Sequence, residues 1–342
     1  MRDEDPAGLA CTSRWECIHA LAVSALRAGC LSPILDGMAS PLTPDRLRAA
    51  GPLAALGALA AVAAAVIGMV AIGTSLGQRL DDGARGGVSA WWDPEAYGAT
   101  SRFLDTISVA SLAILGAVLM ATALVRGRPR LAIAAGAVLL GANLTTQVLK
   151  EVVDRPDLVE GAGVGPGSFP SGHTTVAMSL AMALVIVVPP ALRWIAAVGG
   201  CAYAASVGIA VVAIDWHRPS EVVGAYLVVV AWTGLVMAGL VASGEDPGGA
   251  DARLGGLGAA LAAAMAGVFA IVVWVEAARR LDVGSAIDDR TAFAAGAAAC
   301  ALACALLGAV TTAAIQRASS SPRAVPQARV RRDARRHPHR RG

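Results

Sequence analysis

Charged side chains are scarce in this sequence. Only 15% of its 342 residues are charged, whereas 56% are hydrophobic and the mean hydropathy is +0.61. One soluble core of this size would not bury so much apolar mass, so we expect a membrane protein. The formal net charge is only +3, and basic residues cluster in 329–341. This distribution argues against a nucleic-acid-binding groove.

Signals for metal binding and secretion are missing as well. The six cysteines include no C-x-x-C pair, so we expect neither a zinc site nor a disulfide framework. The first 37 residues contain no continuous apolar region and no clear small-residue cleavage site, so we do not expect a signal peptide there. Met38 is an alternative start of translation. We therefore assign no function to residues 1–50 and expect them to be disordered or partly untranslated.

Long apolar runs dominate the remaining chain. A bilayer core of about 30 Å requires roughly 20 apolar residues in a helix. About eight runs approach this length, and we expect an all-α, polytopic membrane helical bundle spanning 51–316. The runs are 53–75, 106–125, 131–149, 173–190, 194–214, 220–242, 254–276 and 291–315.

Arginines in short loops predict the orientation of the bundle. They lie between the second and third runs, between the fourth and fifth, and in the tail 317–342. Positive loops face the cytoplasm, so we expect a plasma-membrane protein with both termini inside. The loops 76–105, 150–172, 215–219 and 277–290 then lie outside. The basic tail is expected to be disordered, either lying on anionic lipid headgroups or merely solvated.

Two histidines fall in the membrane domain, and each lies at the outer end of a run. His173 ends the sequence Pro170-Ser171-Gly172-His173, which joins the Gly-rich segment 161–168 to the fourth run. The free N–H groups at such a helix N-terminus favour a phosphate. Lys150 ends the third run and is the only lysine in the chain, and Arg155 follows it. Two cations near this loop suit a multiply charged anion.

His217 joins the fifth run to the sixth, in the sequence His217-Arg218-Pro219-Ser220-Glu221. If Pro219 lies in the first turn of a helix, the His217 and Glu221 side chains are one turn apart and can meet. Glu221 then accepts the Nδ1–H bond and leaves Nε2 free to attack. Each motif alone also has an ordinary explanation as a snorkelling side chain, a turn or a helix cap. Their joint position on one face indicates one polar site.

These residues resemble the signature of the type 2 phosphatidic acid phosphatase superfamily, which is K-x6-R-P, then P-S-G-H, then S-R-x5-H-x3-D. The second motif is complete here. The first is two residues shorter, as Lys150-x4-Arg155-Pro156, and the third keeps His217 with Glu221 as its acid. Val211 stands where the third motif has arginine, and Arg218 is a candidate substitute. The resemblance covers about 130–242.

The resemblance implies a six-helix core and a phosphatase mechanism without metal or cofactor. His217 attacks phosphorus, His173 protonates the leaving oxygen, and water then hydrolyses the phosphohistidine. The remaining site residues, which hold the phosphoryl oxygens, are Lys150, Arg155, Ser171, Gly172 and Arg218.

The implied substrate is a lipid phosphate, with phosphatidate, phosphatidylglycerol phosphate and polyprenyl phosphates or pyrophosphates all admissible. A lipid phosphotransferase of the same fold remains an alternative. So does an inactive membrane scaffold or a transporter. The sequence assigns no oligomeric state.

Overall fold

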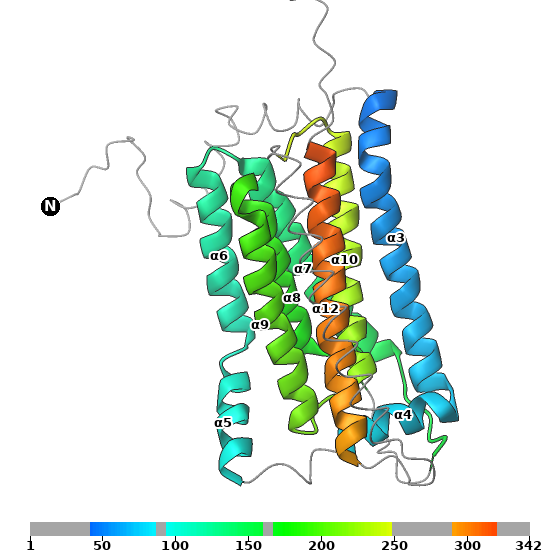
Figure 1. Cartoon of the computed structure of the whole chain (residues 1–342). Coiled ribbons are helices and arrows are strands. Elements are labelled where there is room, and N and C mark those ends of the chain that lie inside the picture. Colours follow the sequence, from blue (N-terminus) through cyan, green and yellow to red (C-terminus); the bar gives the residue numbers. More distant parts are fainter. Residues whose placement is uncertain (1–41, 87–93, 160–166, 248–288, 320–342) are drawn as a thin grey trace, which may run out of the picture.

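The all-α prediction is confirmed by a computed structural model, which describes residues 42–86, 94–159, 167–247 and 289–319. Within these ranges every regular element is a helix (Figure 1). In chain order they are α3 (Pro44–Gly73), α4 (Ser75–Gly86), α5 (Pro94–Asp105), α6 (Val109–Val125), α7 (Pro129–Val152), α8 (Gly172–Val187), the short 3-10 helix η1 (Pro190–Leu192), α9 (Arg193–Ala213), α10 (Pro219–Ala242) and α12 (Asp289–Ser319).

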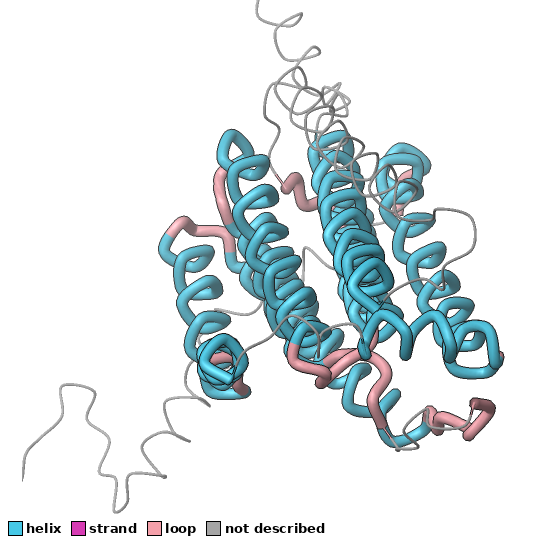
Figure 2. Tube along the Cα trace, turned by 60° about the horizontal axis from the view of Figure 1, so that its bottom comes forward, coloured by secondary structure: helices cyan, strands magenta, loops and turns pink. Residues whose placement is uncertain are grey.

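The long helices run side by side in both views of the bundle (Figures 1 and 2). Five spans in the described residues are long and apolar enough to cross a membrane: α3, α7, η1 with α9, α10 and α12. The α5–α6 pair, bent by 53°, is a sixth if it counts as one span, and α8 is a shorter apolar helix. The chain is therefore a multi-pass membrane protein, although the count of eight spans is not confirmed.

Several predicted segments fall wholly or mostly outside the described residues. They are the N-terminal segment 1–50, the Gly-rich segment 161–168, the seventh run 254–276, the loop 277–290 and the basic tail 317–342. The described ends that flank the seventh run, at the end of α10 and the start of α12, lie at opposite ends of the bundle (Figure 1). The expected boundaries at 50 and 317 also shift, because α3 begins at Pro44 and α12 ends at Ser319.

The segment 76–105, predicted as an outer loop, instead contains most of α4 and all of α5. Thr74 separates α4 from α3, because its backbone is extended and its hydroxyl accepts a bond of 3.0 Å from the Gly77 amide. Such side-chain capping starts a new helix in a new direction. Gln78, Asp81 and Ala84 are buried and lie three residues apart. This spacing turns one face of α4 toward the bundle.

α8 lies at the centre of the bundle, where it contacts α6, α7, α9 and α10. Twelve of its 16 residues are buried. Even its buried polar side chains are hydrogen-bonded within the protein; for example, Thr175 Oγ1 lies 3.0 Å from Thr146 Oγ1 on α7. The central position of α8 places its first residues, Gly172 and His173, in the middle of one end of the bundle.

α3 and α10 approach each other closely through glycines. A Cβ atom added at Gly57 would lie 2.9 Å from the Ala231 carbonyl oxygen, and one added at Gly234 would lie 2.7 Å from the Leu53 carbonyl oxygen. Small residues let helix backbones meet in this way inside a membrane. The contact fixes α3, and with it the attached helix α4, against α10.

We expect Gly57→Ala to destabilise the protein by about 1–3 kcal/mol, because the added methyl group overpacks a backbone contact. Gly51→Ala is the matched control, since nothing lies within 4 Å of a Cβ atom at that position of the same helix. Thermal unfolding of both variants in detergent, followed by tryptophan fluorescence, measures the difference. Equal melting temperatures would contradict a close α3–α10 contact.

Candidate active site

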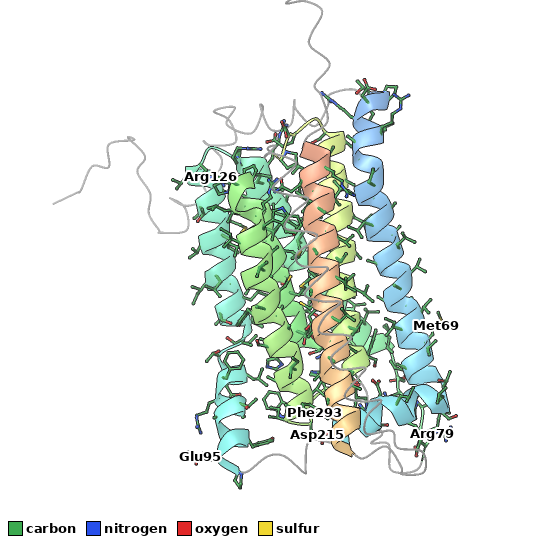
Figure 3. All side chains as sticks on the ribbon, in the orientation of Figure 1. Met69, Arg79, Glu95, Arg126, Asp215 and Phe293 are labelled. Carbon is green, nitrogen blue, oxygen red and sulfur yellow. The ribbon has the colours of Figure 1, made fainter. Side chains whose placement is uncertain are left out.

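One end of the bundle gathers the chemically active residues. α7 ends there with Lys150, α8 begins there with His173, and the turn between α9 and α10 carries His217 (Figure 1). Figure 3 shows Asp215, two residues before His217, at this end and Arg126 at the opposite end. The polar motifs therefore lie at one end of the bundle, as the alternation of apolar runs predicts.

His217 and Glu221 meet as the sequence predicts. Pro219 is the first residue of α10, and the Nδ1 atom of His217 lies 2.7 Å from Oε2 of Glu221. Glu221 is fully buried and also accepts a bond of 3.1 Å from the Arg218 amide. Because a carboxylate can only accept hydrogen bonds, Nδ1 is the donor and the lone pair remains on Nε2. This tautomer is the one that a nucleophilic histidine needs.

Lys150 and His173 lie beside this pair. A Cβ atom at Gly172 would be 3.4 Å from Lys150 Nζ, so the ammonium group lies against the first residue of α8. The rings of His173 and Trp216 pack with their centroids 5.5 Å apart. Trp216 directly precedes His217, and so it bridges the two histidines. A helix N-terminus, a cation and two imidazoles thus converge on one spot.

Ser171, which is predicted to bind phosphate, makes two hydrogen bonds within the protein. Its amide donates to the carbonyl oxygen of Glu221 at 3.0 Å, and its buried hydroxyl accepts a bond of 3.0 Å from the Thr174 hydroxyl as the N-cap of α8. The amide is thus engaged within the protein, and the hydroxyl oxygen caps α8. Ser171 therefore fastens the start of α8 to α10, and Gly172 is the residue of this motif left nearest to Lys150.

Arg155 and Arg218 both contact α4. Asp82 accepts a bond of 2.5 Å from Nε of Arg218 and one of 3.1 Å from Nη2 of Arg155. Asp81 lies 3.9 Å from Nη1 of Arg155 and accepts bonds from the amide and hydroxyl of Ser220. Both arginines are buried, with 6% and 4% of their surface exposed. The two arginines that are predicted to bind phosphate therefore lie together, and in this structure their partners are carboxylates of α4.

The sequence interpretation did not include Asp81 or Asp82. A signal was present, because two adjacent acids lie in a segment predicted to face the same side as Arg155 and Arg218. The pairing itself joins residues 73 and 136 positions apart. No local spacing rule reaches that far, so only the fold reveals the contact.

Val211 occupies the position of the third-motif arginine and cannot replace its charge. The side chain is fully buried, while its carbonyl oxygen accepts bonds of 3.0 Å from the amides of Trp216 and His217. These bonds close the turn that presents His217. Among the described residues, no group of three or more His, Cys, Asp or Glu side chains is placed to hold a metal ion.

Comparison with known families agrees with this arrangement. The model of the PAP2 superfamily matches residues 131–244, so this segment is similar to that superfamily and the match supports membership. The match indicates phosphatase or phosphotransferase activity on a phosphorylated substrate. No curated protein and no solved structure gives a match. The matched segment spans α7 to α10, whereas α3, α4 and α12 lie outside it.

Asp81 makes stability depend on pH. Burial raises its pKa from 3.8 to about 6, against the opposing effects of the Ser220 hydrogen bonds and the Arg155 charge. Between these two pH values the folded protein holds a proton that the unfolded chain releases. The free energy of unfolding therefore falls as pH rises through this window, by up to about 3 kcal/mol from this group.

We expect Asp81→Asn to become more stable than the wild type as pH rises from 4 to 7. The amide does not ionise, and its oxygen still accepts a bond from the Ser220 amide. Melting temperatures in detergent across this pH range measure the effect. Asp157→Asn is the control, because Asp157 is exposed to solvent. Parallel pH profiles for Asp81→Asn and the wild type would exclude a buried, titrating Asp81.

Proposed function

We propose that the protein is a membrane phosphatase that hydrolyses a phosphomonoester or pyrophosphate of a lipid through a phosphohistidine. The contact between His217 Nδ1 and buried Glu221 is the observation that carries this proposal. It leaves Nε2 as a nucleophile and supplies a negative charge to stabilise the imidazolium that forms. An inactive scaffold would have no need for this pair beside Lys150 and a second histidine.

In the proposed first step, His217 Nε2 attacks phosphorus in line as the bond to the leaving oxygen breaks. His173 donates a proton to that oxygen. In the second step, water attacks the phosphohistidine and His173 removes its proton, which returns both histidines to their starting states. Lys150, the Gly172 amide, Arg155 and Arg218 hold the phosphoryl oxygens and stabilise their charge.

An apolar groove beside the site supports a lipid substrate. Its volume is about 750 Å³, and it runs between α3, α7 and α10. Leu149 and Val153, which lie on either side of Lys150 in the chain, both line it. On α3 it extends from Gly73 to Ala61, a length of about 18 Å at the rise of a helix. We propose that the groove holds the hydrocarbon chain of the substrate while its phosphate lies at Lys150.

The distribution of arginine supports an extracytoplasmic site. Arg126, Arg128 and Arg130 lie in or beside the α6–α7 turn, and Arg193 begins α9. These elements are at the end of the bundle opposite His217 (Figures 1 and 3). Positive residues in short loops favour the cytoplasm. We propose that this end is cytoplasmic, as are both termini, and that the catalytic end faces outward at the plasma membrane.

Replacing the two central residues tests the chemistry. We expect His217→Ala to abolish phosphate release, and Glu221→Gln to lower kcat by about 10²-fold or more, because the amide stabilises neither the imidazolium nor the required tautomer. His173→Ala should slow turnover and let phosphohistidine accumulate. Released phosphate is measured with purified protein in detergent against phosphatidate, phosphatidylglycerol phosphate and polyprenyl phosphates and pyrophosphates.

Wild-type rates in the His217→Ala protein would contradict the mechanism. Unchanged turnover in Glu221→Gln would remove Glu221 from it. A comparison of free phosphate with phosphate transferred to an added alcohol separates a hydrolase from a phosphotransferase. Absence of both products for every lipid tested would favour the scaffold alternative.

Filling the groove tests the lipid assignment. Ala65 lines the groove from an exposed position of α3, so we expect Ala65→Trp to raise KM for a long-chain lipid phosphate by about tenfold through lost apolar contact. A short-chain, water-soluble phosphate ester should be hydrolysed as by the wild type. Ala58→Trp is the control, because Ala58 is exposed on the same helix but outside the groove. Equal KM values for the long-chain substrate in both variants would contradict a chain-binding groove.

A further inference from the structure

Two buried arginines at the site keep N–H groups without an acceptor. Nε and Nη1 of Arg155 and Nη2 of Arg218 have no hydrogen-bond partner among the described residues. Both side chains are almost fully enclosed, with 3% and 5% of their surface exposed. Leaving charged donors without a hydrogen-bond acceptor in such a position is costly. An anion with several oxygens would satisfy them.

One carboxylate, that of Asp82, contacts both of these guanidinium groups. Oδ1 of Asp82 accepts from Arg218 at 2.5 Å, and Oδ2 accepts from Arg155 at 3.1 Å. Arg218 is bound on another edge by Oε1 of Glu221 at 3.3 Å, and Glu221 Oε2 in turn contacts His217. A continuous chain of contacts therefore links Asp82 on α4 through Arg218 and Glu221 to the imidazole.

We propose that Asp82 is a positioning residue, which bridges Arg155 and Arg218 so that their free N–H groups form, with Lys150, a receptor for the phosphoryl oxygens. This inference rests on the proposed function and extends it to a helix outside the matched family segment. Asp82 does not touch the substrate. It acts through the two arginines. In particular, it holds the Arg218 guanidinium near His217, where the family motif has an arginine and this chain has Val211.

Positioning and simple electrostatics predict opposite results for Asp82→Asn. Removing a negative charge near a phosphate site strengthens anion binding if charge alone matters. If Asp82 positions the arginines, its loss weakens anion binding, because the guanidinium groups no longer point their donors together. If Asp82 only holds α4 in place, Asp82→Asn lowers the melting temperature and leaves the affinity for anions unchanged.

The tether between Arg85 and Asp215 provides a matched control. It also joins α4 to the turn before His217, with bonds of 2.5 and 3.1 Å, and contacts neither Arg155 nor Arg218. Asp215 has a φ of 64°, which asparagine tolerates well. Asp215→Asn therefore removes the same charge and loosens the same helix without disturbing the arginine pair.

Anion binding can be measured without turnover, because Lys150 is the only lysine. Inorganic vanadate mimics the five-coordinate phosphorus of the transition state and should shield Lys150 from an amine-directed reagent. Mass spectrometry separates this label from that on the N-terminal amine. The vanadate concentration that halves labelling is compared for the full-length wild type, Asp82→Asn, Asp82→Glu and Asp215→Asn in detergent, with melting temperatures alongside.

We expect Asp82→Asn to raise the half-protecting vanadate concentration by about 10- to 100-fold, Asp82→Glu to restore part of the loss, and Asp215→Asn to stay within about threefold of the wild type. Tighter protection in Asp82→Asn, or a change equal to that in Asp215→Asn, would overturn the positioning role. The proposed function fails separately, if vanadate never shields wild-type Lys150 and no lipid releases phosphate.

Discussion

The carboxylate of Glu221 is fully buried at the first turn of α10, and the groups around the catalytic end are arranged to satisfy it. His217, the Arg218 amide and the Arg218 guanidinium each contact one of its oxygens. A buried charge is stable only when it is paired and hydrogen-bonded. The same residue's carbonyl oxygen accepts from Ser171, which ties α8 to α10. One residue thereby fixes the imidazole, its neighbouring arginine and the helix that carries His173.

Sequence spacing predicted the local parts of this arrangement. The His217–Glu221 contact follows from a four-residue separation across a helix start, and the shared end of Lys150, His173 and His217 follows from the alternation of apolar runs. These inferences require only the helical repeat and the length of a membrane span. The class of the fold could be predicted from the sequence for the same reason, whereas the family segment was inferred from the resemblance of its motifs to a known signature.

Long-range contacts could not be predicted in this way. Whether Arg155 faces a substrate or a carboxylate depends on where α4 lies, and α4 lies there because glycines bring α3 against α10. Ser171 likewise belongs to a motif that predicts phosphate binding, but its amide donates to the carbonyl oxygen of Glu221, 50 positions later in the chain. Contacts that depend on how distant helices pack produce no periodic pattern in a single sequence.

The charges at this end are nearly balanced in the absence of substrate. Lys150, Arg155 and Arg218 carry positive charge, while Glu221 and Asp82 carry negative charge and Asp81 has a pKa raised by burial to about 6. Near balance lets these groups remain enclosed at a modest cost of desolvation. The hydrogen bonds are less complete than the charge pairing, because three nitrogen atoms of the two guanidinium groups have no hydrogen-bond acceptor among the described residues. A site whose charges are balanced, but whose N–H donors lack acceptors, favours a ligand rich in acceptor oxygens. A phosphoryl group is such a ligand.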